Sequence, residues 1–260
     1  MSTNTKNKRA SLHEWQVEQL RLTAFPSPSV KLPDVGWWEN VVGRPPEART
    51  SRPKTGELKE EGTFETGVLV LSIQPLRIDW RLAKAQQEEL IDGDLPVIGE
   101  FPNLLESLIA TMQRWLEKDC PEITRLAFGV VLLLPVENRQ AGYERLSAYL
   151  HDIRLDPVGS SDFLYQINRS RSSGTGIQGL QVNRLSKWSV FSLVRSLMLL
   201  SNRAIQATQL SIPENYACRL ELDINTAADF SEILARDKLL PIFREFVELA
   251  KEIVEKGDVP

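Results

Sequence analysis

Charged and apolar side chains alternate in the segment LRIDWRL, residues 76–82. Such alternation is typical of a β-strand with one buried face and one face in water. The charged face carries Arg77, Asp79 and Arg81, and we expect it to be the solvent face of a half-buried strand. Because arginine binds carboxylates and phosphates through paired N–H groups, the same face could instead contact a partner. The side chains predicted for the core are those of Leu76, Ile78, Trp80 and Leu82.

Further basic side chains occur in two similar segments, YQINRSR at residues 165–171 and LQVNRLS at residues 180–186, which we expect to pair as strands. Together with residues 76–82 they could form a basic patch that contacts phosphates. The net charge of −4 argues against a nucleic-acid partner. Carboxylates on a protein partner also suit arginine. The candidate contact residues are Arg77, Arg81, Arg169, Arg171, Arg184 and Lys187.

The glycine-rich segment GTGIQG, Gly174–Gly179, matches the G-x-G-x-x-G pattern of dinucleotide sites. In such sites the glycines lie between a strand and a helix whose N-terminus receives the pyrophosphate. Here a strand-like segment follows the glycines instead. The sequence therefore favours a hairpin loop over a nucleotide site.

Residues suited to catalysis are few. With only His13 and His151 in the chain, we predict neither a histidine-based zinc site nor a Ser-His-Asp triad, and we expect no cofactor. A divalent-metal hydrolase remains an alternative if Asp79 and Asp223, each on the polar face of a strand, converge. The simpler interpretation makes both of them surface carboxylates that face arginines across the sheet.

A second acidic motif has the spacing used by some magnesium nucleases. It consists of Asp34 after a proline, followed by Glu57-x-Lys59. Glu57 and Lys59 lie in a polar, charged run, where such clusters are usually solvated. We interpret the motif as a chance match.

The elements that would position these residues mix helices and strands without regular alternation, which predicts an α+β fold. We expect a mixed or antiparallel sheet built from hairpins and packed by two to four helices, including a long C-terminal helix. The segment 188–200 fits a strand slightly better than a helix. The helices are predicted at residues 101–116, 137–153 and 239–254, and the strands at 68–82, a doubly covered 123–136, and 218–225.

The beginning of the chain is predicted to be an extension of this core. We expect a disordered tail at residues 1–10, and then an N-terminal arm and loop at residues 11–62. In this arm we expect a short helix at residues 11–22, because Ser11 with Glu14 has the spacing of a helix-capping box. Residues 43–62 are rich in proline, glycine and charge, as exposed loops are. The α+β core would cover residues 63–260, with two candidate subdomains at about 63–155 and 156–260.

Composition limits the class of protein. Over 260 residues, 42% hydrophobic and 25% charged side chains are typical of a globular chain. No secretory signal is evident, and the longest apolar run, residues 127–136, is too short to span a bilayer. Cys120 and Cys218 are far apart and are predicted to be buried thiols. We expect a cytoplasmic protein without membrane association.

The C-terminal helix is predicted to have two adjacent apolar rows that repeat every seven residues. Two such rows could cover the protein's own sheet and still leave apolar surface for a neighbour, in a homodimer or a heteromeric contact. The alternative is that both rows are buried within one chain. The candidate assembly residues are Leu239, Phe243, Phe246, Val247, Ile253 and Val254.

The order of three motifs resembles an uncharacterised, sporadically distributed family of bacterial and archaeal proteins of similar length. The motifs are an early I-Q-P-x5-W-R hairpin, a helix after an aromatic or proline segment, and a late L-x-L-D-I strand before a terminal helix. The resemblance begins at about Gly62, and it implies no catalytic residues. The matching positions are Ile73, Gln74, Pro75, Trp80 and Arg81, the segment GEFPNLLESL, and Leu220, Leu222, Asp223 and Ile224.

Three functional hypotheses follow. The first is a non-enzymatic cytoplasmic interaction or scaffold protein, with a protein partner or a second copy of itself. The patchy distribution of the family it resembles points to a prokaryotic host-defence or mobile-element system. The second is a nucleic-acid-binding protein that uses the basic hairpin, and the third is the divalent-metal-dependent hydrolase or nuclease.

Overall fold

A computed structural model of the chain describes residues 9–28, 36–85, 95–193, 196–198, 209–211 and 215–259. Most of the predicted N-terminal tail lies outside these residues, as do Asp34 of the acidic motif and residues 194–195 and 199–200 of the segment whose structure was ambiguous. That segment is otherwise extended, as predicted, up to Leu193 and again from Ser196 to Met198.

One large antiparallel sheet organises the fold, and the predicted α+β class is confirmed. Its strands follow the order β2-β3-β4-β5-β1-β6-β12-β9-β7, with β8 also paired to β9. A separate small sheet contains β10 (Ser196–Met198) and β11 (Gln209–Ser211). The strands of the large sheet are β1 (Gln16–Pro26), β2 (Ala48–Arg52), β3 (Glu57–Phe64), β4 (Gly67–Gln74), β5 (Arg77–Ala83), β6 (Ile123–Val136), β7 (Leu164–Asn168), β8 (Arg171–Ser172), β9 (Gln181–Leu193) and β12 (Asn215–Thr226).

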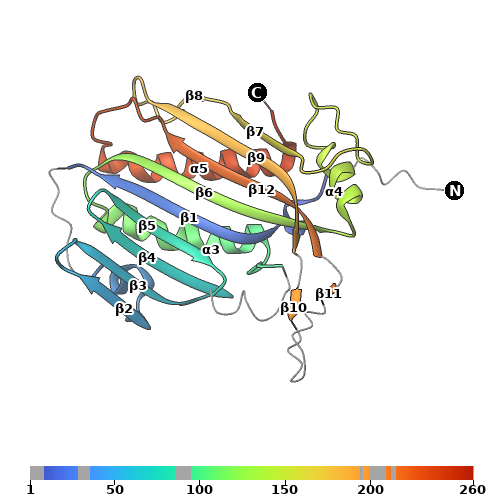
Figure 1. Cartoon of the computed structure of the whole chain (residues 1–260). Helices are drawn as coiled ribbons and strands as arrows, with labels where there is room; N and C mark the ends of the chain where they lie inside the picture. The colour runs from blue at the N-terminus through green and yellow to red at the C-terminus, as the bar shows by residue number, and fades with distance from the viewer. Residues whose placement is uncertain are drawn as a thin grey trace, which may run out of the picture.

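The two long helices lie on the same face of this sheet (Figure 1). They are α3 (Phe101–Arg114), which continues as the π-helical turn η2 (Trp115–Asp119), and α5 (Arg236–Lys256). Both are amphipathic and bury their apolar sides, as predicted. The shorter helical elements are η1 (Leu12–Glu14), α1 (Trp37–Val42) and α4 (Arg139–Leu146).

The predicted hairpin at residues 68–82 is present as β4 and β5, with Pro75 in the turn, where its missing N–H breaks no ladder hydrogen bond. Ile78, Trp80 and Leu82 are completely buried, as predicted. The prediction for Leu76 is wrong, because it lies in the turn with 64% of its surface exposed.

Two predictions for the beginning of the chain are wrong. The segment after Ser11 forms a single 3-10 turn, which keeps the Ser11–Glu14 capping box, and then becomes the central strand β1 instead of a helix. Residues 43–62 contain β2 and most of β3, so they are not merely a loop. The sheet therefore begins within the predicted arm. The two candidate subdomains also share it, since β6 pairs with β12.

Both apolar rows of the C-terminal helix α5 are buried within the chain. The six residues predicted for assembly are each at most 4% exposed, so in this structure none of them lies on a surface that a partner could contact. The physical reason is the width of the sheet and the presence of η2 beside the helix, which together cover both rows. These residues are Leu239, Phe243, Phe246, Val247, Ile253 and Val254.

Candidate binding surface on the open face of the sheet

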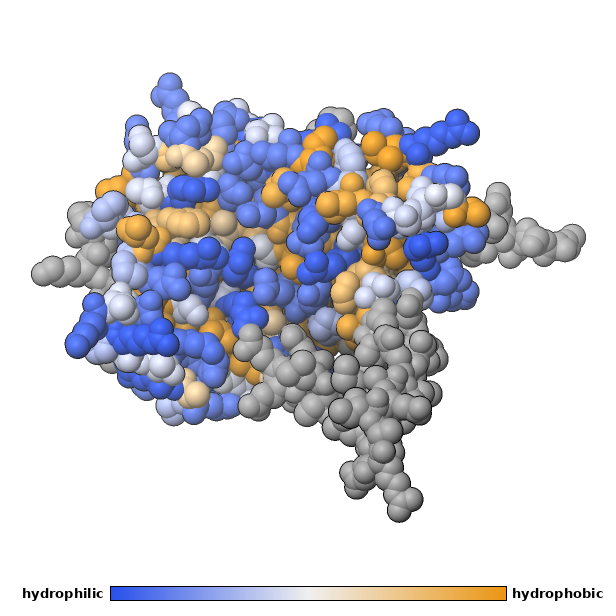
Figure 2. Space-filling model, viewed as in Figure 1, coloured by the Kyte–Doolittle hydropathy of each residue, from blue (hydrophilic) through white to orange (hydrophobic). Residues whose placement is uncertain are grey.

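The face of the sheet opposite α3 and α5, here called the open face, is turned toward the viewer in Figure 1. Hydrophilic side chains cover most of it, and apolar side chains lie between them (Figure 2). Residues 123–136 form the predicted strand, β6, and among the described elements the long helices α3 and α5 lie on only one of its two faces (Figure 1). The side chains of the open face include Gln19, Arg21, Thr23, Val68, Val70, Arg77, Asp79, Arg81, Gly129, Val131, Leu185, Lys187, Arg219, Glu221 and Asp223.

Asp79 organises the centre of the open face. Arg77 donates two hydrogen bonds to its carboxylate, from Nε at 2.6 Å and from Nη2 at 2.9 Å. Thr23 donates a third from its hydroxyl at 2.6 Å, and the Nε of Arg21 lies 3.9 Å away. The hydrogen bond to Asp79 raises the pKa of Arg77. Asp79 is thus a structural acceptor that fixes Arg77, and the predicted solvent-facing position of both side chains is correct.

Arg21 and Arg81 lie directly opposite each other on the paired strands β1 and β5. Like charges at such positions repel each other. Arg21 leans the other way, over Gly129 of β6, where a Cβ atom would lie 3.4 Å from its Nη2. Gly129 therefore provides the space into which the first guanidinium turns.

Arg81 has no ion pair or hydrogen bond with any residue that the structure describes. The Nε of Arg21 is buried and likewise lacks a hydrogen-bond partner there. Three arginines, Arg21, Arg77 and Arg81, surround Asp79, whose hydrogen bonds go to Arg77 and Thr23. The second carboxylate near Arg21 and Arg77 is that of Asp223. The centre of the open face consequently carries an excess of positive charge.

A ladder of ion pairs crosses the other half of the open face. Lys187 contacts Glu221 at 2.9 Å, and Arg219 contacts both Glu221, at 2.5 Å, and Glu18, at 3.0 Å. Asp223, one strand beyond Gly129, accepts a hydrogen bond from Asn225 at 2.9 Å. This half of the open face is close to charge balance.

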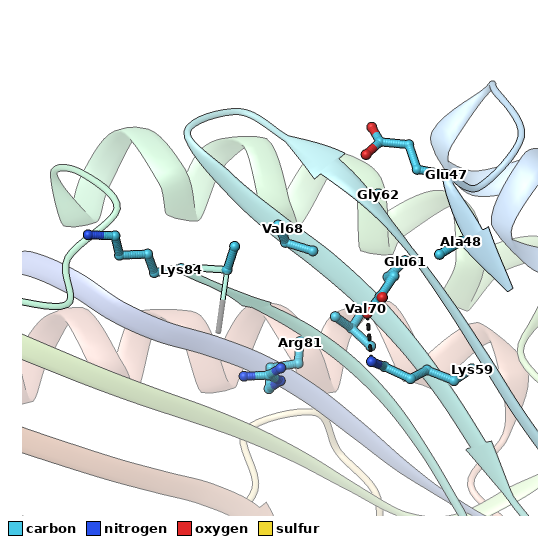
Figure 3. A pocket seen from close by; sticks show the side chains of 10 residues that line it. Glu47, Ala48, Lys59, Glu61, Gly62, Val68, Val70, Arg81 and Lys84 are labelled. Carbon is cyan, nitrogen blue, oxygen red and sulfur yellow. Dashed lines mark ion pairs between the residues drawn. The ribbon is translucent and has the colours of Figure 1, made fainter. Parts of the chain in front are cut away.

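Two shallow depressions flank the arginine pair. One, of about 340 Å³, lies between β3, β4 and β5, and Figure 3 shows Arg81 and Lys84 on its β5 side and Glu47 opposite them. Its Lys59 and Glu61 form an ion pair at 2.6 Å. The other, of about 350 Å³, is lined by Arg21 and by residues of β6, β7, β9 and β12. Each arginine of the pair therefore faces its own depression.

The predicted contact residues do not share one surface. Only Arg77, Arg81 and Lys187 lie on the open face, and Arg81 alone among these three has no ion pair within the described chain. Arg184 points to the opposite side, is 5% exposed, and donates to the main-chain oxygen of Arg169 at 3.0 Å. Burial lowers the pKa of Arg184.

Arg169 and Arg171 are held by acidic residues of the C-terminal region. Arg169 binds Asp258 through Nε at 2.6 Å and Nη2 at 2.9 Å, and Arg171 contacts Glu245 at 3.4 Å. A basic ribbon that combines the six predicted residues is therefore absent, although contact of any one of them with a partner stays a prediction.

The glycine-rich segment is the hairpin loop that the sequence favoured, between β8 and β9. Its hydrogen-bond donors are directed at a carboxylate of the chain itself: Gly174 N donates to Glu245 at 2.8 Å and Ser173 Oγ donates to it at 2.6 Å. An anionic phosphate would have to displace Glu245. The loop is thus held against the side of α5 through Glu245.

The acidic residues do not assemble into a metal centre. Asp79 on β5 and Asp223 on β12 are separated by β1 and β6, and within the described ranges no three His, Cys, Asp or Glu side chains cluster as metal ligands. Glu57 faces Arg52 at 3.2 Å. The two histidines make separate contacts, His13 with Glu100 at 2.9 Å and His151 with Arg9 at 3.2 Å. The hydrolase hypothesis gains no support from this geometry.

Sequence reasoning missed Arg21, because its segment was assigned to a helix. The available signal was Gly129 inside an otherwise apolar, β-branched strand, since a glycine there often marks a close approach by another group. Comparisons with protein-family models, with curated proteins and with solved structures found no match for this chain. The family resemblance therefore stays a prediction. In the described part of the chain, no helix combines the length and apolar character that crossing a membrane requires.

Proposed function

We propose that this protein is a non-enzymatic interaction protein that binds a protein partner on the open face of its sheet. The observation that carries the proposal is Arg81, which has no ion pair or hydrogen bond with the described residues and lies on the sheet face opposite the described helices α3 and α5 (Figure 1). A guanidinium without a partner is available for an intermolecular bond, and arginine is enriched at protein interfaces.

The surroundings of Arg81 support a protein partner. Val68 and Val70 lie beside it in the same depression, and Val131 and Leu185 lie in or beside the neighbouring depression. Interfaces combine such apolar contacts with a few oriented polar groups. Nucleic acid is less well suited, because its binding depends on several free cations, and four of the six candidate basic residues are bound to carboxylates.

A second copy of this chain is also a less suitable partner. In a two-fold dimer the same surface meets itself, so contact through the open face would bring two arginine clusters together. We therefore favour a different protein.

Site-specific photo-cross-linking in native cells tests this proposal. A photoreactive phenylalanine analogue replaces Gln166, which is exposed on the open face, and, as the matched control, Glu248 on α5, whose side chain is 71% exposed. We expect one protein to be cross-linked from position 166 and not from position 248. Equal products from both positions, or products from position 248 alone, would refute the proposed surface. Nuclease-sensitive products from position 166 would favour the nucleic-acid hypothesis.

A further inference from the structure

We infer that the open face binds an acidic segment of its protein partner, with one carboxylate held by Arg81 and a second by Arg21. This inference rests on the proposed function and specifies the chemistry of the partner. Arg21 and Arg81 face each other across β1 and β5. Their like charges repel each other at positions where opposite charges would stabilise the sheet.

The two guanidiniums turn away from each other into separate depressions. Arg21 leans over Gly129, while Arg81 lines the depression between β3, β4 and β5 (Figure 3). A single small anion would therefore contact only one of them at a time. A chain that carries several carboxylates can reach both.

The spacing suits an extended peptide. Alternate residues of an extended chain lie on the same side, about 6.6 to 6.8 Å apart, whereas adjacent strands in a sheet are separated by about 4.8 Å. Because the two side chains diverge, their charged groups lie farther apart than the strands that carry them. Glutamates at alternate positions of a peptide therefore fit the two arginines.

The two contacts are unequal. Arg81 has no acidic partner among the described residues, whereas Arg21 lies 3.9 Å from Asp79 and lines the same depression as Asp223. These carboxylates partly neutralise Arg21. Arg81 is thus the main contact and Arg21 the second.

The inference is tested by nuclear magnetic resonance titration of the full chain, at an ionic strength of about 20 mM, where charge interactions are weakly screened. The probe is a capped peptide of four Glu-Ala repeats. Its neutral control has four Gln-Ala repeats, and inorganic phosphate is the third ligand. The amide signals of Gly129 and Val70 report on the two depressions.

We expect the acidic peptide to shift both signals, and the neutral peptide and phosphate to bind at least about tenfold more weakly, the ratio expected when one charged hydrogen bond is lost. Arg81→Gln should weaken peptide binding about tenfold and Arg21→Gln about threefold. Arg244→Gln makes the same charge change on the helix side and should leave affinity within about twofold. Unchanged unfolding midpoints verify that the variants fold.

Three results would overturn the inference. They are an acidic peptide that does not bind, a peptide whose affinity is equal in wild type and Arg81→Gln, and phosphate that binds as tightly as the peptide. If one of these results is found and the wild-type chain still gives the cross-linked product from position 166, the open face remains the proposed docking surface. Only the inference that the partner segment is acidic is then refuted. If the wild-type chain gives no cross-linked product from position 166, by contrast, the proposed function itself fails.

Discussion

Asp258 binds the segment after α5 to the rest of the fold, and replacing this residue with alanine should lower the free energy of unfolding of the protein. Asp258 follows α5, its side chain is 6% exposed, and its main-chain N–H donates to Tyr149 at 3.0 Å. Its carboxylate accepts two hydrogen bonds from Arg169 and one from the Tyr165 hydroxyl at 2.6 Å. These contacts join the C-terminus to β7 and the segment that follows it.

The magnitude follows from those contacts. Hydrogen bonds to a charged group contribute about 1.5 to 3 kcal/mol each, but Arg169 is 26% exposed and regains water when its partner is lost. Breaking a fully buried ion pair costs about 3 to 5 kcal/mol. We therefore expect Asp258→Ala to lower the free energy of unfolding by about 2 to 3 kcal/mol at neutral pH, between the values for exposed and fully buried pairs.

This contribution should depend on pH. The hydrogen bonds from Arg169, and then that from Tyr165, hold the pKa of Asp258 below its ordinary value of 3.8. For a carboxylate whose pKa is lower in the folded state, the stabilisation is complete above the pKa of the unfolded chain and disappears as pH falls through the folded value. The difference between wild type and Asp258→Ala should accordingly be largest at about pH 7 and should shrink below about pH 4.

Urea unfolding, followed by tryptophan fluorescence, measures the effect. The matched control is Glu248→Ala, which removes an exposed pair with Lys251 and should cost less than about 1 kcal/mol. A double-mutant cycle with Arg169→Ala isolates the ion pair. If Asp258→Ala costs no more than Glu248→Ala at about pH 7, or if its cost is the same at about pH 3, the reasoning is refuted.

Three further predictions concern the interior. Phe246→Ala should lower the free energy of unfolding by about 3 to 5 kcal/mol, because the ring is fully buried in the chain's own core. Phe246→Glu should unfold the chain, as measured by circular dichroism, and light scattering should show no folded, dissociated form of this variant. Gly67→Ala should lower the unfolding free energy in urea by about 1 to 3 kcal/mol, since a Cβ there would lie 2.9 Å from the main-chain oxygen of Ala83. Burial raises the pKa of the Cys120 and Cys218 thiols to about 12, so both should react with a thiol reagent only after urea unfolds the protein; rapid reaction in native buffer would contradict their burial.

The elements with a clear period were predictable from the sequence. The alternation in residues 76–82 predicted a strand, and its charged face is correct from Arg77 onward. The helical spacing of residues 101–116 and 239–254 predicted both long helices. Strand β1 was not found, because the bulge between Val17 and Gln19 interrupts its alternation. The interval from Val17 to Leu20 then resembles helical spacing.

Strand β3 was missed for a different reason. Its inward-facing positions include Glu60 and Gly62, which remove the apolar signal that a half-buried strand usually carries. The candidate site was predictable only in part, since Arg77 and Arg81 are local to one strand. The pairing of Arg21 with Arg81 depends on β1 lying next to β5. The paired residues of these two strands are 54 or more positions apart in the sequence, so no local pattern reveals the pairing.

The central claim is that a partner protein is held on the open face by Arg81 and Arg21. It is tested most directly by measuring the yield of the cross-linked product from position 166 in cells that produce either wild type or the double variant Arg21→Gln, Arg81→Gln, with Arg244→Gln as control. We predict that the product is lost in the double variant and retained in the control. Retention of the product in the double variant, with the variant folded, would contradict the claim.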